Sequence, residues 1–591
     1  MKMRLALLAT LVGLVSFAAP RSASACGGFF CSGQQIDQSG ERVLYVLEDG
    51  HVQAHIQIQF QGDAADFSWV VPVQSVPTVS AGSDDLFNAL LATTVPQFSR
   101  DDQTDKSCRD LWDEEADLAG GDGGGDGDAD SDADADRDGD VTVVASGVAG
   151  PFDYQVIDSD DPDALQDWLT ENGYDVPDNS LPIIASYLDS GMFFLGLQLT
   201  KGSDAGDLRP VVLDMDQDEA CLPIRLTAIA ATADMPILVW VLADEQAVST
   251  NYAEVWLNDL HLYMQQSPDY SAIVNGALDE AGGRAFLVDF AGAPDMARDA
   301  LRPDRYDVDR LRGLTDARDF VRELQAQGIL QSPLATSLMA EHLPVPKALV
   351  AEGVTQEMFQ QCITCDGGCS GDYYYDYDCY SPCERCYGDE LESLGYTFDT
   401  NAFADAVDAS IAEPLRRAAE PFSRLTKLTR LYTTMSPAEM TEDPIFMTNA
   451  DLPDVANVRN GVRTLRCHTG SPYYDTTTPN GLRACYPDEW DFTPEDLPFA
   501  LLAIQQSENG AGTLVVDNRS EIQTRYPCAG RPDSPAIYVP GGRFAGSPTD
   551  PWSVNRTGGN GGLCSVSGTA PSAAPIAIAL AALAVVWRRK R

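Results

Sequence analysis

Histidine is scarce in this chain, and the common catalytic motifs are absent. The 591 residues include five histidines: His51, His55, His261, His342 and His468. His51 and His55 lie four residues apart in a segment with strand periodicity, so they do not form the helical pair of an HExxH zinc site. The chain has no G-x-S-x-G elbow, no Walker loop and no G-x-G-x-x-G after a strand. The sequence therefore assigns no catalytic residue and favours a role other than catalysis.

Positive charge is also in short supply. Lysine and arginine together number 39 against 90 aspartates and glutamates, which gives a formal net charge of −51. Such a surface repels phosphate backbones, so nucleic acid is excluded as a partner, and a cation or a basic protein is favoured. Hydrophobic residues make up 44% of the chain, which is typical of a globular protein.

The N-terminus has the pattern of an export signal. Residues 1–25 have an early Lys2 and Arg4, an apolar run and Ala23-Ser24-Ala25 before Cys26. This pattern predicts a signal peptide with an A-x-A cleavage site. Export leads to an oxidising compartment, so we expect the fourteen cysteines to form disulfides.

The C-terminus has a second short apolar run. Residues 573–587 are apolar, and Arg588-Arg589-Lys590-Arg591 follows. The run is shorter than the roughly twenty residues of a spanning helix, and its basic end would remain in the cytoplasm. A Gly/Pro/Ser-rich linker at 531–563 precedes Cys564. We predict a sorting or transmembrane segment at 564–591 with Cys564 as the processing and lipidation site, and a plain tail anchor is the alternative.

The alternation of apolar and polar residues predicts a mixed fold. Val52, Ala54 and Ile56 alternate with polar residues, and Asp49-Gly50 before them predicts a hairpin turn. Further strands are predicted at 192–199, 222–230, 237–242 and 253–257, and helices at 162–172, 181–188, 307–359 and 399–435. We therefore predict an α+β fold, with a β-rich N-terminal layer domain at 26–300 followed by a helical and cysteine-rich region at 301–530.

A cysteine-rich hairpin at 362–386 has mirror-symmetric spacing. Its six cysteines are Cys362, Cys365, Cys369, Cys379, Cys383 and Cys386. The spacing predicts an antiparallel hairpin with two or three disulfides, although it leaves their connectivity open. The outer C-x2-C pairs match a Cys₄ zinc site as the alternative. Cys26 and Cys31 are a further candidate disulfide pair, and the tyrosines between Cys369 and Cys379 are candidate contact residues.

Residues 113–140 are almost entirely Asp, Gly and Ala, which predicts an exposed acidic insertion without a core. Asp134, Asp136, Asp138 and Asp140 match the first half of a calcium-binding loop. Position twelve of that loop is Ala145 rather than glutamate. A calcium site and a solvated acidic loop both remain open; apart from this calcium, the sequence predicts no cofactor.

Several segments resemble the DUF2330 family of exported bacterial proteins. They are CGGFFC…QIDQSGERVLYVLEDG, DFSWVVPVQSVPTVS, DALQDWLTENGYDVP, LPIRLTAIAATADMPILVWVLA and LTRLYTTMSPAEMTEDPIFMTNADLPDVANV. The resemblance extends from Cys26 to about Val458. Because this family has no established activity, the resemblance implies export but gives no catalytic residue.

The terminus GGLCSVSGTAPSAAPIAIALAALAVVWRRKR resembles a MYXO-CTERM sorting signal of myxobacteria and relatives. This resemblance implies cleavage near Cys564 by a rhomboid-type sorting protease, lipid attachment at Cys564 and display on the cell surface. We expect an exported envelope or surface protein with a binding or structural role, whose ligand is a protein or a cation. The alternatives are an extracytoplasmic enzyme, either a carboxylate-based or a metal-dependent hydrolase, and a calcium-stabilised envelope protein.

Overall fold

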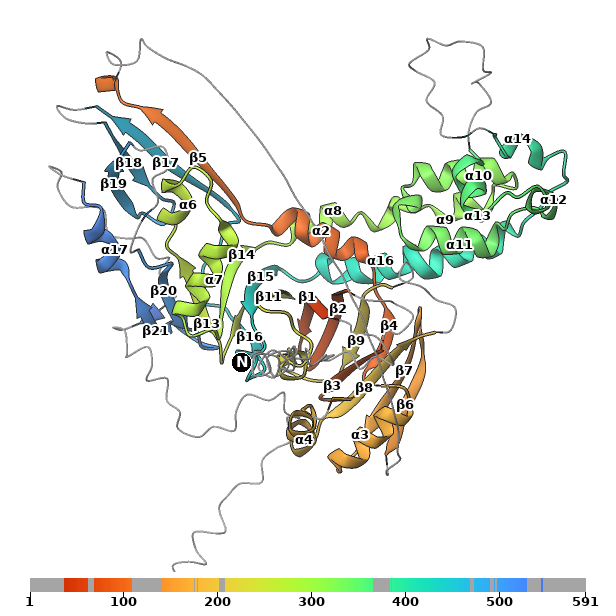
Figure 1. Ribbon diagram of the computed structural model, residues 1–591, viewed down its shortest axis with the longest axis horizontal. Helices are drawn as coiled ribbons and strands as arrows, with labels where there is room; N and C mark the ends of the chain where they lie inside the picture. Colours follow the sequence, from red (N-terminus) through yellow and green to blue (C-terminus); the bar gives the residue numbers. More distant parts are fainter. Residues whose placement is uncertain are drawn as a thin grey trace, which may run out of the picture.

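The computed structural model describes residues 37–61, 68–108, 141–174, 176–177, 179–200, 208–364, 383, 385–467, 472–488, 494, 497–528 and 544–545. The fold is α+β, as predicted, and is built on one large mixed sheet (Figure 1). The strand order in this central sheet is β22-β21-β20-β13-β14-β15-β11-β1-β2-β9-β4. Its strands are β1 (Asp37–Glu48), β2 (His51–Gln61), β4 (Thr78–Ala81), β9 (Val211–Met215), β11 (Met235–Ala243), β13 (Ala253–Leu257), β14 (Ala285–Gly292), β15 (Lys427–Met435), β20 (Ala500–Gln505), β21 (Gly512–Asp517) and β22 (Phe544–Ala545).

The predicted hairpin is confirmed by β1 and β2. The two strands pair antiparallel from Asp37↔Gln61 to Glu48↔His51, so Asp49 and Gly50 form the two-residue loop. Gly50 has a φ of 72°, while Asp49 keeps a negative φ, so the turn is not the type I′ that the dipeptide favours. The hairpin then joins the centre of the sheet, because β1 also pairs parallel with β11.

One face of the central sheet is covered by a second sheet. The strands β3 (Ser68–Val73), β8 (Phe193–Leu199), β7 (Phe152–Asp158) and β6 (Thr142–Ala149) form it in that order. Val43 and Tyr45 of β1 pack against Trp69 and Leu195 in the core between the two sheets. Two helices, α3 (Pro162–Glu171) and α4 (Leu181–Asp189), pack on this sheet through their own cluster, and β10 (Ala220–Cys221), β16 (Ile445–Asn449) and β12 (Gln246–Ser249) form a small third sheet.

The opposite face of the central sheet is covered by helices. Leu44 and Trp240 belong to the core on this side, where Trp240 Nε1 donates to Thr94 Oγ1 at 2.9 Å. The helices α2 (Asp84–Thr94), α8 (Asp295–Leu301) and α16 (Glu413–Ala419) lie between the sheet and a helical arm (Figure 1). The arm consists of α9 (Val308–Arg312), α10 (Ala317–Ala326), α11 (Leu334–His342), α12 (Lys347–Ala351), α13 (Gln356–Cys362), α14 (Gly388–Leu391) and α15 (Thr400–Val407).

A parallel crossover lies on the other half of the central sheet. Strand β13 is followed by α6 (Leu260–Met264) and α7 (Tyr270–Glu280), and the chain returns as β14, parallel to β13. Helix α7 covers β13, β14 and β20 through Ile273, Val274 and Ala277. Beside it stands an outer sheet in the order β19-β18-β17-β5, made of β19 (Arg483–Pro487), β18 (Tyr473–Thr477), β17 (Val458–Arg466) and β5 (Gln97–Thr104). The last described helix is α17 (Arg519–Arg525).

Two predicted elements are wrong. The segment 222–230 contains a helical turn, α5 (Ile224–Thr227), and no strand. The segment 399–435 is helical only to η7 (Glu420–Ser423), after which β15 enters the middle of the central sheet between β14 and β11. Leu425, Leu428 and Leu431 fit a helical stripe, but the threonines around them favour a strand, and a short apolar run fits both.

The central sheet takes strands from both sides of the predicted domain boundary at residue 300. The central sheet contains β13 and β14 from before the helical arm and β15, β20 and β21 from after it. The region 301–530 is therefore a helical arm followed by strands that complete the first sheet. In the part of the chain that the structure describes, no helix has the length and apolar character needed to cross a membrane.

Candidate functional site

A pocket of about 210 Å³ lies where the parallel strands β13 and β14 separate. The strands pair only from Ala253↔Ala285 to Val255↔Leu287, and beyond that register their ends diverge. The carboxyl end of parallel strands is the usual ligand site of open α/β sheets. Most of the lining is apolar, and its charged members are Glu254, Asp259, Asp454 and Arg459. We call this cavity the strand-end pocket.

Asp259 is the unusual member of this lining. It follows β13 directly and is 4% exposed, yet its carboxylate has no hydrogen-bond or ion-pair partner within the described residues. It occupies the N-cap position of α6 without capping the helix, because Asn258 Oδ1 accepts from Leu260 N instead. Burial raises the pKa of Asp259 to about 6, and the positive charge of Arg459 opposes the rise.

Glu254 has a different environment, although it is equally buried. Trp256 Nε1 donates to Glu254 Oε1 at 2.8 Å, and Gln506 Nε2 donates to Oε2 at 2.5 Å. Both carboxylate oxygens therefore already accept hydrogen bonds. Asp454 is also partnered, since it forms an ion pair with Lys427 at the rim, where its side chain is 66% exposed. Of the three carboxylates that line the pocket, Asp259 is thus the one that neither accepts a hydrogen bond nor forms an ion pair within the described residues.

Arg459 is the cation of the pocket, but its donors are directed to the backbone. Its Nη2 donates to the carbonyls of Val288 and Asp289, and its Nε to that of Ala456. The guanidinium also lies 5.6 Å from the ring centroid of Phe98. Arg459 is the second residue of β17, and the loop before this strand is fixed to β14 by a two-way backbone bridge between Ala291 and Val455.

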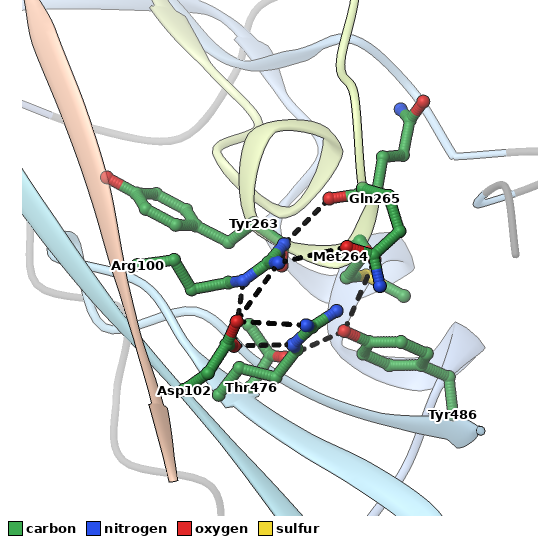
Figure 2. A network of polar contacts seen from close by, with 9 residues as sticks. Arg100, Asp102, Tyr263, Met264, Gln265, Thr476 and Tyr486 are labelled. Atoms are coloured by element: carbon green, nitrogen blue, oxygen red, sulfur yellow. Dashed lines mark hydrogen bonds and ion pairs between the residues drawn. The ribbon is translucent and has the colours of Figure 1, made fainter. Parts of the chain in front are cut away.

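The short helix α6, which carries Asp259 at its start, is held at its other end by the outer sheet (Figure 2). Arg100 of β5 donates through Nη1 to the carbonyls of Tyr263 and Gln265 at 3.1 and 2.7 Å. Tyr486 Oη donates to the Met264 carbonyl, so the free carbonyls at the helix end are satisfied. Asp102 accepts from both Arg100 and Arg463, which connects this clamp to β17.

Disulfides are present, as the export argument predicts. Cys108 is bonded to Cys467, Cys362 to Cys383, and Cys485 to Cys528. Cys221 and Cys386 are also disulfide-bonded. A cysteine in a disulfide is not a thiolate ligand, so the zinc alternative, which needs Cys362 and Cys383 together, does not hold. Cys26, Cys31, Cys365, Cys369 and Cys379 lie outside the described residues.

The remaining predicted site residues also lie outside the described part of the chain. They are the calcium candidates Asp134, Asp136, Asp138 and Asp140 and the processing candidate Cys564. Among the described residues, Asp475, Cys485 and Cys528 come within 4.8 Å of one another. Because Cys485 and Cys528 form a disulfide, this group does not offer the thiolates of a metal site.

The histidines do not converge on a site in the described chain. His55 alternates with the apolar residues of β2, yet it is buried at 2% exposure. Burial lowers its pKa to about 4, and Arg417 contributes to the decrease. His51 contacts Asp214, while His261 and His342 stack on Phe499 and Phe403. None of the four lines the strand-end pocket.

The sequence did not single out Asp259, Glu254 or Arg459. One signal was available, because an acidic residue directly after the predicted strand 253–257 lies at a strand end. With 90 acidic residues in the chain, that signal does not distinguish Asp259 from the others.

A family model described as an uncharacterised protein conserved in bacteria (DUF2330) matches residues 20–337. The chain belongs to this family. No curated protein and no solved structure matches the chain. The family segment includes Glu254 and Asp259, while Asp454 and Arg459 come from strands and loops beyond it.

Proposed function

We propose that this member of the DUF2330 family is an exported, disulfide-stabilised binding protein that holds a small amine with an apolar body in the strand-end pocket. The observation that carries the proposal is the buried and unpartnered Asp259 carboxylate at the ends of β13 and β14. An ammonium group would supply the missing counter-charge, and charge-assisted hydrogen bonds are about twice as strong as neutral ones. The surrounding apolar walls would bury the rest of the ligand.

The charge of the pocket also favours a cation over an anion. Three carboxylates and one guanidinium line it, and the guanidinium of Arg459 is held by backbone carbonyls. Trp256 adds an aromatic ring to the wall, which is a suitable surface for a cationic group. The net charge of −51 attracts cations from a distance as well.

The test uses phenethylamine as the probe, with the neutral 2-phenylethanol and the anionic 3-phenylpropionate as matched compounds. Calorimetry on the wild-type chain should detect the amine and not the other two. Asp259→Asn should weaken amine binding by about 10- to 100-fold, as expected when one charge-assisted hydrogen bond is lost. Asp454→Asn, which changes a carboxylate at the rim of the same pocket, is the control and should leave binding within about threefold.

Equal affinity of Asp259→Asn and the wild-type protein for the amine would refute the proposal. Preference for 3-phenylpropionate would refute it as well, because Arg459 would then be the group that recognises the ligand.

A carboxylate-based hydrolase is the second candidate. The pKa of Asp259, raised by burial to about 6, is suited to a general acid or base near neutral pH. The other buried carboxylate of the pocket, Glu254, is engaged by Trp256 and Gln506, which favours binding over two-carboxylate catalysis. Incubation with N-acetylphenethylamine separates the two candidates, because a hydrolase would release the amine and a binding protein would leave the amide intact.

Export and surface anchoring are part of the same proposal. The disulfides support an oxidising compartment, and the predicted signals at 1–25 and 564–591 would supply the route. Intact mass of the protein from its native host should give a chain that starts at Cys26, ends near Cys564 and carries a lipid. A Cys564→Ala variant should keep the tail Trp587–Arg591, and normal trimming of this variant would refute Cys564 as the processing site.

A further inference from the structure

A large cleft opens on the other half of the molecule, where the central sheet meets α2 and the start of the helical arm. It consists of two adjoining cavities of about 470 and 540 Å³ that share Asp84 and Arg209 as lining residues. The first extends over the free outer end of β2, since β9 pairs with β2 only as far as Ile56. The second continues between α2 and the turns that follow α8 and α10. Figure 1 shows α2 and α8 at this junction, and we call the two cavities together the arginine cleft.

The balance of charge in this cleft is the reverse of that in the whole chain. Four arginines line it, namely Arg42, Arg209, Arg302 and Arg305, against the two aspartates Asp84 and Asp85. In the full sequence, acidic residues outnumber lysine and arginine by 90 to 39. A surplus of arginine at one concave site of so acidic a protein is therefore a local feature that the general composition does not produce.

Contacts within the cleft leave part of this positive charge unmatched. Asp85 is paired with Arg305 and also accepts from Tyr306 Oη at 2.8 Å. Asp84 accepts from Gln57, whose carbonyl oxygen in turn accepts from Arg42 at 3.0 Å. Arg42 thus contacts a neutral amide and has no ion pair among the described residues.

Arg302 is the most available of the four arginines. It is exposed, it lies in the left-handed region with a φ of 40°, and in the described chain its side chain has no ion pair. A non-glycine residue in this conformation is strained, and such residues are concentrated at ligand sites. The turn after α8 therefore presents an uncompensated guanidinium to the cleft.

Neutral hydrogen-bonding groups accompany the arginines. Asn88, Gln325 and Gln331 line the cleft with exposed amides that make no side-chain hydrogen bond within the described residues. An amide both donates and accepts, as a hydroxyl group does, so these three side chains match a hydroxylated ligand. The guanidinium groups match a carboxylate or a phosphate, which they bind in a bidentate geometry.

We propose that the arginine cleft is a second binding site, independent of the strand-end pocket, for a hydroxylated small molecule with one anionic group, such as an acidic sugar. Arg302 binds the carboxylate or phosphate, and the amides of Asn88 and Gln331 bind hydroxyl groups. The negative field of the whole molecule opposes anions, so recognition depends on these local contacts.

The experiment measures binding of four probes to the full chain by calorimetry: glucuronate, glucose 6-phosphate, glucose and inorganic phosphate. We expect the two acidic sugars to bind, inorganic phosphate to bind at least about tenfold more weakly than glucose 6-phosphate, and glucose to give no signal at millimolar concentration. The ratio of glucuronate to glucose 6-phosphate affinity then decides whether the anionic group is a carboxylate or a phosphate.

Variants tie the binding to the cleft. Arg302→Asn keeps a residue that tolerates the left-handed conformation but removes the charge, and it should weaken both acidic sugars at least about tenfold. Arg302→Lys keeps the charge but loses the bidentate geometry, so it should weaken both acidic sugars less than Arg302→Asn does. The matched control is Arg298→Gln on α8, whose ion pairs with Asp295 and Asp299 lie outside the cleft, and it should bind like the wild-type protein.

Two further outcomes concern the amides and the independence of the site. Gln331→Ala should weaken glucuronate and leave phosphate unchanged, and Asp259→Asn should leave both unchanged. The proposal is overturned if glucose binds as well as glucuronate, if no acidic sugar binds, or if Arg302→Asn keeps wild-type affinity.

Discussion

Buried carboxylates have opposite pKa shifts in two regions of the molecule. One region is the outer sheet, and the other is the central sheet with the adjoining helix α6. In the outer sheet, Asp475 accepts from Arg466 and Arg483 at 2.7 Å each. Burial acts to raise the pKa of Asp475, but the hydrogen bonds from the two arginines outweigh it and hold the pKa below the ordinary value. In the central region, burial raises the pKa of Glu41 to about 7 and that of Asp259 to about 6.

This contrast separates carboxylates that support the fold from those that weaken it. Asp475 and Asp102 bind arginines from neighbouring strands and thereby hold the outer sheet, and the disulfide between Cys108 and Cys467 connects the ends of β5 and β17. Among the described residues, no arginine or lysine contacts Glu41 or Asp259 directly, so each carboxylate destabilises the fold when it is charged. A destabilising group is retained when it serves another purpose, and Asp259 lines a pocket.

The largest effect is expected for Asp475→Asn. Asp475 is 5% exposed, and its loss leaves two largely buried arginines without their shared carboxylate, which should reduce the free energy of unfolding at pH 7 by about 3–5 kcal/mol. The folded-state pKa is lowered, so the stabilisation is present above the unfolded pKa and disappears as the pH falls through the folded one. Urea denaturation at pH 7 and pH 3 measures both parts.

The control for this prediction is Asp295→Asn, which removes an exposed ion pair with Arg298. It should change stability by less than about 1 kcal/mol. If both variants lose the same amount of stability, the arginines of the outer sheet do not depend on Asp475.

The next effect has the opposite sign. Glu41 is 5% exposed, and its carboxylate accepts a hydrogen bond from Gln38. Because its pKa of about 7 exceeds the ordinary 4.5, stability falls as the pH rises from about 4.5 to 7 and stays low above that. Glu41→Gln should therefore be more stable than the wild-type protein at pH 8 by up to about 3 kcal/mol, with no gain at pH 4. Thermal melts at the two pH values measure the difference.

Asp259→Asn should give a gain of similar size together with a loss of function. Its pKa of about 6 exceeds the ordinary 3.8, so stability falls as the pH rises from about 3.8 to 6. The variant should be more stable at pH 7 by up to about 3 kcal/mol and should bind phenethylamine about 10- to 100-fold more weakly. Glu41→Gln is the matched variant, since it should gain stability and keep the ligand. A decrease in stability for Asp259→Asn would show that the carboxylate has a structural partner.

The smallest effect is expected at Arg302. Asparagine tolerates the left-handed conformation better than arginine does, so Arg302→Asn should be as stable as the wild-type protein or more stable by about 0.5 kcal/mol. If the melting temperature of this variant is unchanged while its affinity for acidic sugars is lost, Arg302 serves ligand binding and not stability, as is proposed for Asp259. A loss above about 1 kcal/mol would instead assign it a structural role.

Local patterns predicted the elements that neighbouring residues decide. The hairpin of β1 and β2 follows from alternation and from Asp49-Gly50. The helix predicted at 162–172 is α3, whose N-cap Asp161 accepts from Asp163 N and Ala164 N. These interactions form between residues close in sequence, so the chain encodes them directly. The α+β class could be predicted for the same reason.

The sequence-based predictions failed where contacts between distant segments decide the structure. The leucines of β15 suit a helix as well as a strand, and pairing with β11 and β14 decides between them. His55 alternates as a polar residue should, but the tertiary structure buries it and places it near Arg417 of α16. The strand-end pocket and the arginine cleft are each built from segments far apart in the chain, so local sequence patterns did not predict either of them.

The sequence by itself determined the acidic composition of the chain and its supply of cysteines for disulfides, and from it export and the exclusion of nucleic acid are predictions. Only the tertiary structure decided that Asp259, among the described acidic residues, is buried in a pocket without a direct partner, and where the arginines gather. The physical reason is that a charge becomes distinctive through burial and through its neighbours. Burial and neighbours are set by tertiary contacts. In the strand-end pocket, β13, α6 and the loop before β17 meet, and in the arginine cleft, β2, α2 and the helical arm meet.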